Sequence, residues 1–221
     1  MAEQKSDMVL KAVLENKIIA IVRGVYGDDV LRLSEALLQN GIRMIEVTYD
    51  QTGKAEDTAD TIRLISEHFA GDVLAGAGTV MSAEQTRIAK DAGARYIISP
   101  NVKEEVIRET KKLGMISMPG ALTPTEIAAA YEMGADVVKI FPASVLGPSY
   151  IKAVKAPLKH IPVMAVGGIN EKNARDYIAA GAAGVGVGGN LVNRQWVSEG
   201  KFDEIGRIAG ELRKNVFVKG E

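Results

Sequence analysis

The sequence predicts an α/β protein with the architecture of a (β/α)8 TIM barrel and an extra N-terminal helix. Three observations lead to this prediction: eight short apolar runs recur along the chain, helical patterns separate them, and glycines mark the helix ends. Such regular alternation favours a closed barrel over an open doubly wound sheet, which the strand count alone does not exclude. No linker or low-complexity segment interrupts the sequence, so residues 1–221 are expected to form one domain.

The expected strands are apolar runs bounded by glycine or polar residues. They are short enough for barrel strands, and their side chains should alternate between the inside and the outside of the barrel. The eight runs are Ile18–Val22, Met44–Thr48, Val73–Gly76, Tyr96–Ser99, Met115–Met118, Val137–Phe141, Val163–Val166 and Val185–Gly188.

Capping residues and glycines mark the expected helices. Three stretches match the capping-box pattern of a helix start: Ser82 with Gln85, Asn101 with Glu104, and Thr123-Pro124 with Glu126. Helix ends are expected at Gly41, Gly93, Gly114, Gly134 and Gly181. A further helix, about residues 6–16, should cover the bottom of the barrel.

Composition and charge exclude several classes of function. With 47% hydrophobic and 25% charged residues, the chain can form a substantial core. A net charge of −1 without a long basic cluster argues against nucleic-acid binding, and no apolar run approaches the roughly 20 residues that cross a bilayer. The start of the chain lacks the core of a signal peptide. We therefore expect a cytoplasmic protein whose partners are small molecules, with no nucleic acid and no membrane.

Few residue types remain for chemistry. The chain has no cysteine, which excludes thiol catalysis and thiolate metal sites, and it has only two histidines. A histidine-rich metal centre or a serine-histidine triad is therefore not expected. The chemistry must rest on lysine, glutamate, arginine and the backbone.

Lys139 is the most informative residue, because it is a lone amine in the apolar run Val137–Phe141. Burial of an ammonium is costly, so a buried lysine tends to lose its proton, and a neutral amine is a nucleophile. This favours covalent chemistry on a carbonyl group. A structural lysine, paired with a carboxylate or extended to the strand end, is the alternative.

Glu46 is likewise an ionisable residue inside an expected strand, in the run Met44–Thr48. Because inward side chains of a barrel converge, Glu46 and Lys139 can meet and each can shift the pKa of the other. A structural ion pair between them is the alternative. Alternation along the first strand places Arg23 at its exit, where catalytic residues of barrels lie.

Glycine-rich segments follow three of the strands. Gly76-Ala77-Gly78-Thr79 is expected to be a turn whose glycines admit a ligand and whose Thr79 hydroxyl binds a carboxylate. Glycine pairs follow the seventh and eighth strands at Gly167-Gly168 and Gly188-Gly189, the usual position of a phosphate site in a barrel. Glycines needed only for tight turns are the alternative in each case.

Together these features resemble the class I aldolases of the 2-keto-3-deoxy-6-phosphogluconate (KDPG) and 4-hydroxy-2-oxoglutarate (KHG) family. The resemblance spans nearly the whole chain. It rests on Ile21-Val22-Arg23, Glu46-Val47-Thr48, Gly76-Ala77-Gly78-Thr79-Val80, Ile98-Ser99-Pro100, Pro119-Gly120, Val138-Lys139-Ile140-Phe141-Pro142-Ala143 and Gly167-Gly168-Ile169.

The resemblance implies a site and an activity. It places the Schiff-base lysine at Lys139 and the general acid/base at Glu46. The implied substrate-binding residues are Arg23, Thr79, Pro100, Phe141, Gly167, Gly168, Gly188 and Gly189. The implied reaction is cleavage of KDPG to pyruvate and glyceraldehyde 3-phosphate without cofactor or metal, or cleavage of 4-hydroxy-2-oxoglutarate or another 2-keto-4-hydroxy acid. The implied assembly is a homotrimer.

Departures from the family pattern concern the substrate. The family commonly continues Glu-Val-Thr with leucine and a carboxylate-binding arginine, whereas this chain has Tyr49-Asp50-Gln51-Thr52. Val166 stands where threonine is frequent, Asn101 replaces a frequent glycine, and Asn190 replaces a frequent serine. Either Arg23 and Thr79 hold the carboxylate unaided or the acceptor side is altered.

Two other functions remain open from the sequence. A barrel isomerase or epimerase of sugar phosphates could use Glu46 as its base and Lys139 as an electrostatic stabiliser, without a covalent adduct. A phosphometabolite-binding protein or assembly subunit could keep the barrel without turnover, although it could then avoid the burial cost of Lys139 and Glu46.

Overall fold

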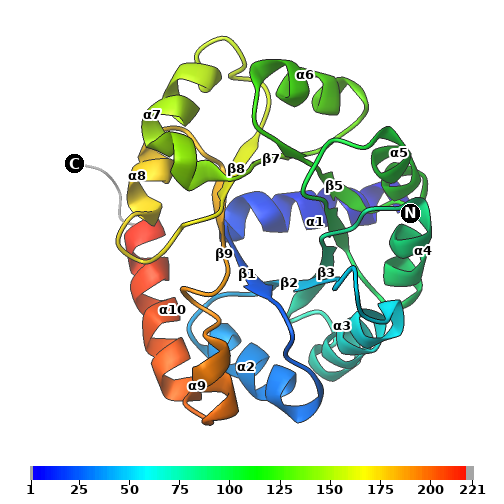
Figure 1. The fold of residues 1–221 in the computed structure, drawn as a ribbon, viewed down its shortest axis with the longest axis vertical. Helices are drawn as coiled ribbons and strands as arrows, with labels where there is room; N and C mark the ends of the chain where they lie inside the picture. The colour runs from blue at the N-terminus through cyan, green and yellow to red at the C-terminus, as the bar shows by residue number, and fades with distance from the viewer. Residues whose placement is uncertain (1, 218–221) are drawn as a thin grey trace.

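The chain folds into a closed parallel barrel, described for residues 2–217 in a computed structural model (Figure 1). The strands are β1 (Ile18–Val22), β2 (Met44–Thr48), β3 (Leu74–Gly78), β4 (Tyr96–Ile98), β5 (Ile116–Met118), β6 (Gly120–Ala121), β7 (Val138–Ile140), β8 (Val163–Val166) and β9 (Gly184–Val187). They form one sheet in the order β5-β4-β3-β2-β1-β9-β8-β7-β6, and all neighbours are parallel.

The barrel closes at the end of the fifth expected strand, Met115–Met118. The two ends of the sheet, β5 and β6, are consecutive in the chain and only Pro119 separates them. Proline has no N–H for the ladder, which explains a break there, but its carbonyl still accepts a hydrogen bond from the Lys139 N–H at 2.9 Å. The predicted (β/α)8 barrel is therefore confirmed, with one of its eight strands in two pieces.

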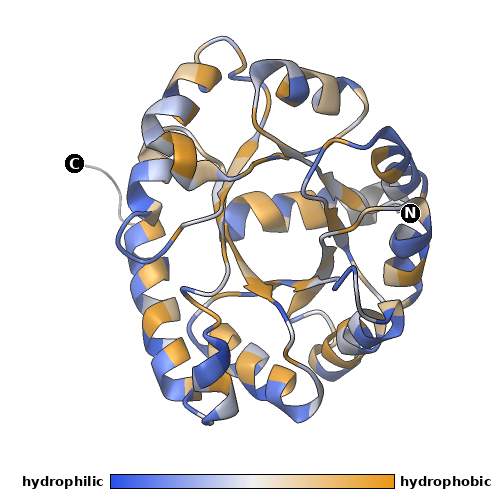
Figure 2. Cartoon of the chain, viewed as in Figure 1, coloured by the Kyte–Doolittle hydropathy of each residue, from blue (hydrophilic) through white to orange (hydrophobic). Residues whose placement is uncertain are grey.

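Helices surround the barrel and turn their apolar sides toward it, as Figure 2 shows by the inward position of the hydrophobic residues. They are α1 (Ala2–Asn16), α2 (Gly27–Gln39), α3 (Ala55–Phe69), α4 (Ala83–Asp91), α5 (Glu104–Lys112), α6 (Pro124–Glu132), α7 (Ala143–Lys155), α8 (Ala174–Ala179), α9 (Arg194–Ser198) and α10 (Phe202–Phe217). Helix α7 is interrupted at Gly147, where φ is 72° and Pro148 follows.

The predicted N-terminal helix is confirmed as α1, which crosses the amino-terminal end of the barrel (Figure 1). Val13 is buried, and Val9 and Leu10 pack with it against the inner cluster that contains Ile19 and Met44. This helix closes the bottom of the barrel with apolar side chains. The polar cavity must then lie at the opposite end.

Two of the three predicted helix starts are confirmed. The Ser82 hydroxyl accepts a hydrogen bond from the Gln85 N–H at 3.1 Å, and Thr123 forms a complete capping box with Glu126. The prediction for Asn101 is wrong, because α5 begins only after Lys103 and the Asn101 carbonyl accepts a bond from the Ser99 hydroxyl. The helix-ending glycines have φ values of 79°, 101°, 68°, 105° and 105° at Gly41, Gly93, Gly114, Gly134 and Gly181.

None of the helices within residues 2–217 combines the length and the apolar character that a membrane span requires. The cytoplasmic location stays a prediction.

Candidate active site

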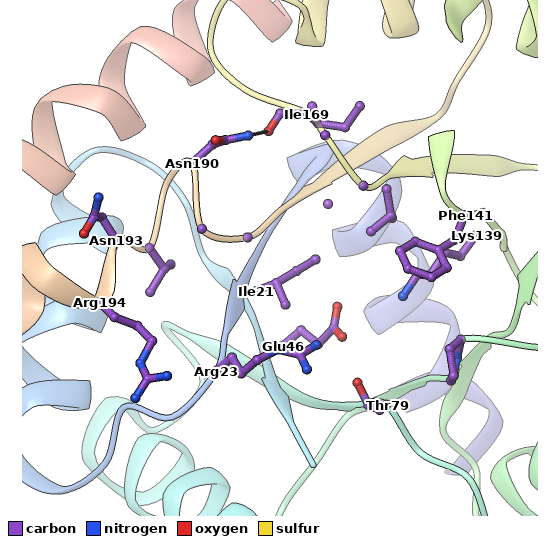
Figure 3. A pocket seen from close by; sticks show the side chains of 18 of the residues that line it. Ile21, Arg23, Glu46, Thr79, Lys139, Phe141, Ile169, Asn190, Asn193 and Arg194 are labelled. Carbon is purple, nitrogen blue, oxygen red and sulfur yellow. Dashed lines mark hydrogen bonds between the residues drawn. The ribbon is translucent and has the colours of Figure 1, made fainter. Parts of the chain in front are cut away.

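The predicted site residues surround one cavity at the carboxyl ends of the strands (Figure 3). The cavity has a volume of about 760 Å³. It is lined by every residue that the sequence placed in the site: Arg23, Glu46, Thr79, Pro100, Lys139, Phe141, Gly167, Gly168, Gly188 and Gly189. The structure therefore brings these residues together, and their individual roles stay predictions.

Glu46 and Lys139 reach the cavity from opposite sides of the barrel, on β2 and β7. Their exposed fractions are 2% and 7%. Met44 and Val137, two residues before each of them, lie in the inner cluster, so strand alternation points both ionisable groups inward. Figure 3 shows the carboxylate and the amine directed into the same part of the cavity.

Two glycines of β3 make room for neighbouring side chains. A Cβ atom at Gly78 would overlap the Glu46 carboxyl group, and one at Gly76 would overlap the ring of Tyr96. The sequence predicted a strand that ends at Gly76 and a turn from Gly76 to Thr79. The position of the turn is wrong, because β3 continues to Gly78. Glycine is required here because a barrel interior cannot hold another side chain beside these two.

Burial moves both ionisable groups toward their neutral forms. It raises the pKa of the Glu46 carboxyl, an effect that Lys139 and then Arg23 oppose. It lowers the pKa of the Lys139 amine, which Glu46 opposes and Arg23 reinforces. Among the ion pairs within 4.0 Å in residues 2–217, none joins the two groups, so the structural ion pair considered from the sequence is not formed. An amine that loses its proton easily can attack a carbonyl carbon.

Phe141 gives Lys139 an aromatic neighbour. The Lys139 Nζ lies 4.7 Å from the centroid of the Phe141 ring, whose residue is 38% exposed. The face of an aromatic ring attracts a cation. The ring can therefore stabilise positive charge on this nitrogen, including the charge of a protonated imine.

The glycine pairs Gly167-Gly168 and Gly188-Gly189 require glycine for different reasons. Gly167 and Gly168 have φ of 96° and 74°, and a Cβ at Gly168 would overlap Ser144, so backbone and packing both require glycine there. At Gly189 a Cβ would meet no protein atom within 4 Å, and at Gly188 only Ile21 at 3.9 Å. Packing does not explain the second pair, and the absence of side chains there leaves backbone accessible from the cavity.

Several lining residues were not predicted as site residues. Asn190 ties the two glycine loops together, because its side-chain amide donates a hydrogen bond to the Ile169 carbonyl at 2.9 Å (Figure 3). The other lining residues include Asn193, Arg194 and Gln195. No sequence signal distinguishes the exposed Arg194 from an ordinary surface arginine. In residues 2–217, no group of three His, Cys, Asp or Glu side chains could hold a metal ion.

A parallel barrel that holds a buried lysine and a buried glutamate over a cavity rimmed by glycine loops has the features of a lysine-dependent barrel enzyme. The sequence of the chain matches the family model "KDPG and KHG aldolase" over residues 9–208.

Individual relatives agree with this match. A 2-dehydro-3-deoxy-phosphogluconate aldolase of Haemophilus influenzae is 34% identical over 209 residues, 94% of this chain and 96% of that protein. A 2-dehydro-3-deoxy-6-phosphogalactonate aldolase of Escherichia coli is 39% identical over 175 residues, 79% of this chain and 83% of that protein. The crystal structure of a KDPG aldolase from Legionella pneumophila, with pyruvate captured as a covalent carbinolamine intermediate, superposes with a TM-score of 0.82. It is 28% identical, and the match covers 92% of this chain and 97% of that one.

The chain belongs to the KDPG and KHG aldolase family. It is a class I aldolase, a carbon–carbon lyase.

Proposed function

We propose that the chain cleaves a 2-keto-3-deoxy-6-phospho sugar acid to pyruvate and glyceraldehyde 3-phosphate through an imine on Lys139. The observation that carries this proposal is the buried amine with a lowered pKa, facing the same cavity as a buried carboxyl group. The names of the relatives supply the class of substrate.

The mechanism uses Lys139 as an electron sink. Its neutral amine attacks the C2 carbonyl, and the carbinolamine takes up a proton as it loses water, which gives a protonated imine. The C3–C4 bond then breaks as a base removes the C4 hydroxyl proton. The bonding electrons move into the imine to leave an enamine, and the aldehyde departs. Protonation at C3 and hydrolysis release pyruvate and restore the amine.

Glu46 is proposed to move these protons. It takes the C4 hydroxyl proton in the cleavage step, and it can return a proton to C3 of the enamine. The raised pKa of Glu46 suits both proton uptake and proton release, because burial disfavours the charged carboxylate. Phe141 would stabilise the protonated imine from the side of the cavity opening.

The remaining lining residues are proposed to hold the two ends of the substrate. Arg23 and Thr79 would bind the carboxylate beside Lys139, with Pro100 shaping the wall. The glycine pairs, at Gly167-Gly168 and Gly188-Gly189, would bind phosphate through the backbone, and Arg194 adds positive charge to this rim.

Two C4 epimers are candidates for the substrate. The gluconate epimer follows from the H. influenzae relative, and the galactonate epimer follows from the E. coli relative. Val166 favours a test of the galactonate form, because this cavity residue offers no hydroxyl group where the family often has threonine. 4-Hydroxy-2-oxoglutarate is the third candidate, since the family name includes it.

A coupled assay tests the proposal. Each compound is incubated with the protein, and released pyruvate is measured with lactate dehydrogenase and NADH. We expect one phosphorylated epimer to be cleaved with a kcat/KM about 100-fold above that of 4-hydroxy-2-oxoglutarate, because remote phosphate binding assists the reacting centre. Failure to release pyruvate from either epimer would contradict the proposal.

We also propose that the chain forms the homotrimer that the resemblance implies. Val145 and Leu146, adjacent residues near the start of α7, are 72% and 37% exposed. Exposed apolar side chains that gather on one face are typical of an interface. Val145→Asp should reduce the sedimenting mass from three chains toward one, whereas Met8→Asp at the other end of the barrel should not. A wild-type monomer would refute this proposal.

A further inference from the structure

We propose that Gln51 is a positioning residue, which holds Thr79 so that the Thr79 hydroxyl binds the carboxylate of the 2-keto acid. This inference rests on the proposed function and adds a residue to it. It answers a specific question, because the loop after β2 lacks the arginine that the family commonly has there.

Thr79 has an unusual backbone conformation. Its φ is +56°, in the left-handed region that β-branched residues rarely adopt. Such conformations persist only where the surroundings fix them, and they are common at ligand sites. Thr79 lines the catalytic cavity and also an adjoining cavity of about 450 Å³. Figure 3 shows its hydroxyl oxygen pointing into the catalytic cavity.

The Gln51 side chain supplies a direct restraint on this turn. Its amide nitrogen donates a hydrogen bond to the Thr79 carbonyl at 2.8 Å. Its amide oxygen accepts one from the Gln85 side chain at 3.2 Å. The Gln85 side-chain oxygen in turn accepts a bond from the Met81 N–H at 2.7 Å. The side chains of Gln51 and Gln85 are hydrogen-bonded to each other, and together they hold both sides of the turn that contains Thr79.

Both ends of this chain of amides are anchored. The Gln85 carbonyl accepts a hydrogen bond from the Tyr49 hydroxyl at 3.0 Å, and the Gln85 N–H is bonded to Ser82. On the other side, the Asp50 carboxylate accepts bonds from the Thr52 N–H and hydroxyl at 2.9 and 2.7 Å. The loop that carries Gln51 is thus folded on itself, so its amide is held in place.

The carboxylate is the group that this arrangement fits. A 2-keto acid bound at Lys139 carries its carboxylate on the carbon next to the imine. Thr79 and Arg23 lie in Figure 3 on the side of the cavity where Glu46 also enters. An exposed arginine and a fixed hydroxyl offer a charge and a directed donor to one anion. Gln51 does not line the catalytic cavity, so it would act only through Thr79.

The test compares two carbonyl compounds. Pyruvate and hydroxyacetone both form imines, but hydroxyacetone has a CH2OH group in place of the carboxylate. Imine formation is trapped with cyanoborohydride over a range of concentrations, for the wild type, Gln51→Ala and the control Gln39→Ala. Gln39 is an exposed glutamine whose amide donates a hydrogen bond to Glu35 within α2, at 3.3 Å.

We expect Gln51→Ala to raise the half-saturating pyruvate concentration about tenfold, the size of effect expected for one lost hydrogen bond. The maximal trapping rate and the response to hydroxyacetone should stay within about twofold, since neither involves the carboxylate site. Gln51→Glu should resemble Gln51→Ala, because it keeps an acceptor for Gln85 and loses the donor to Thr79. A structural role would instead lower the melting temperature and affect both compounds.

A double-mutant cycle isolates the path through Thr79. Thr79→Gly removes the hydroxyl and relaxes the backbone, so Gln51→Ala added to it should change pyruvate binding by less than about twofold. Equal pyruvate saturation in Gln51→Ala and Gln39→Ala, or additive effects in the cycle, would overturn the inference while the proposed function stands. If the wild type traps neither compound on Lys139, the proposed function fails and this inference fails with it.

Discussion

The interior of the barrel and the rim of its cavity hold their site residues on different kinds of segment. Inside, Lys139 and Glu46 belong to the strands β7 and β2, and both side chains are buried. At the rim, Arg23, Thr79 and Arg194 belong to segments that follow the strands. We therefore expect the interior to determine the reaction and the rim to determine the substrate, which is the division expected of a barrel enzyme.

The interior should not tolerate loss of its amine. Lys139→Ala should lower kcat by about 10⁴-fold or more, since no other group can form the imine. The fold should persist, as circular dichroism and the melting temperature will show. A folded Lys139→Ala protein with wild-type turnover would contradict the mechanism.

The carboxyl group should matter less than the amine but more than any rim residue. Glu46→Gln should reduce kcat about 10²- to 10⁴-fold, the usual contribution of a general acid or base. The pyruvate concentration that half-saturates imine trapping should change little, because Glu46 is proposed to act on protons. Equal losses in binding and turnover would indicate a structural role instead.

Gly78 in the interior and Gly189 at the rim allow a matched comparison of the two regions. Gly78→Ala places a methyl group in the space of the Glu46 carboxyl, so we expect a kcat about 100-fold lower and a loss of stability of roughly 1–3 kcal/mol. Gly189→Ala meets no protein atom within 4 Å, so its melting temperature should match the wild type. Only the KM of the phosphorylated substrate should rise. Similar effects of the two changes on the melting temperature would contradict the proposed difference between interior and rim.

The pH dependence of imine formation should reveal how the two regions act on one amine. Trapping requires neutral Lys139, so its rate should rise with pH through a pKa below the ordinary lysine value of 10.5. Glu46 raises this pKa, so Glu46→Gln should move the midpoint to lower pH. Arg23 lowers it, so Arg23→Ala should move the midpoint to higher pH, by less because Arg23 is exposed to solvent. Shifts of the same sign would refute this account.

The same boundary separates what the sequence predicted from what it did not. Lys139 and Glu46 were recognised because a charge in an apolar run is unusual. The strands, the extra helix and the position of the glycine loops followed from regular patterns. Gln51 was noted only as part of a departure from the family pattern, and Arg194 gave no signal, because polar residues in exposed segments resemble any solvated surface.

One contact between distant segments and two local effects explain the remaining differences. The role of Gly78 depends on Glu46, which approaches it from another strand, so the sequence suggested a turn instead. The later start of α5 depends on the local hydrogen bond from the Ser99 hydroxyl to the Asn101 carbonyl. The break between β5 and β6 falls at Pro119, which has no N–H for the ladder. Residue type revealed the chemistry, and only the folded chain revealed which residues support it.

The most direct test of the central claim is peptide mass spectrometry after incubation with pyruvate and borohydride, which converts an imine to a stable secondary amine. The account predicts one pyruvyl adduct, on Lys139, and none on Lys155, whose pKa burial also lowers but which lies outside the cavity. A folded protein that carries no adduct on Lys139 in excess pyruvate, or carries it on another lysine, would contradict the account.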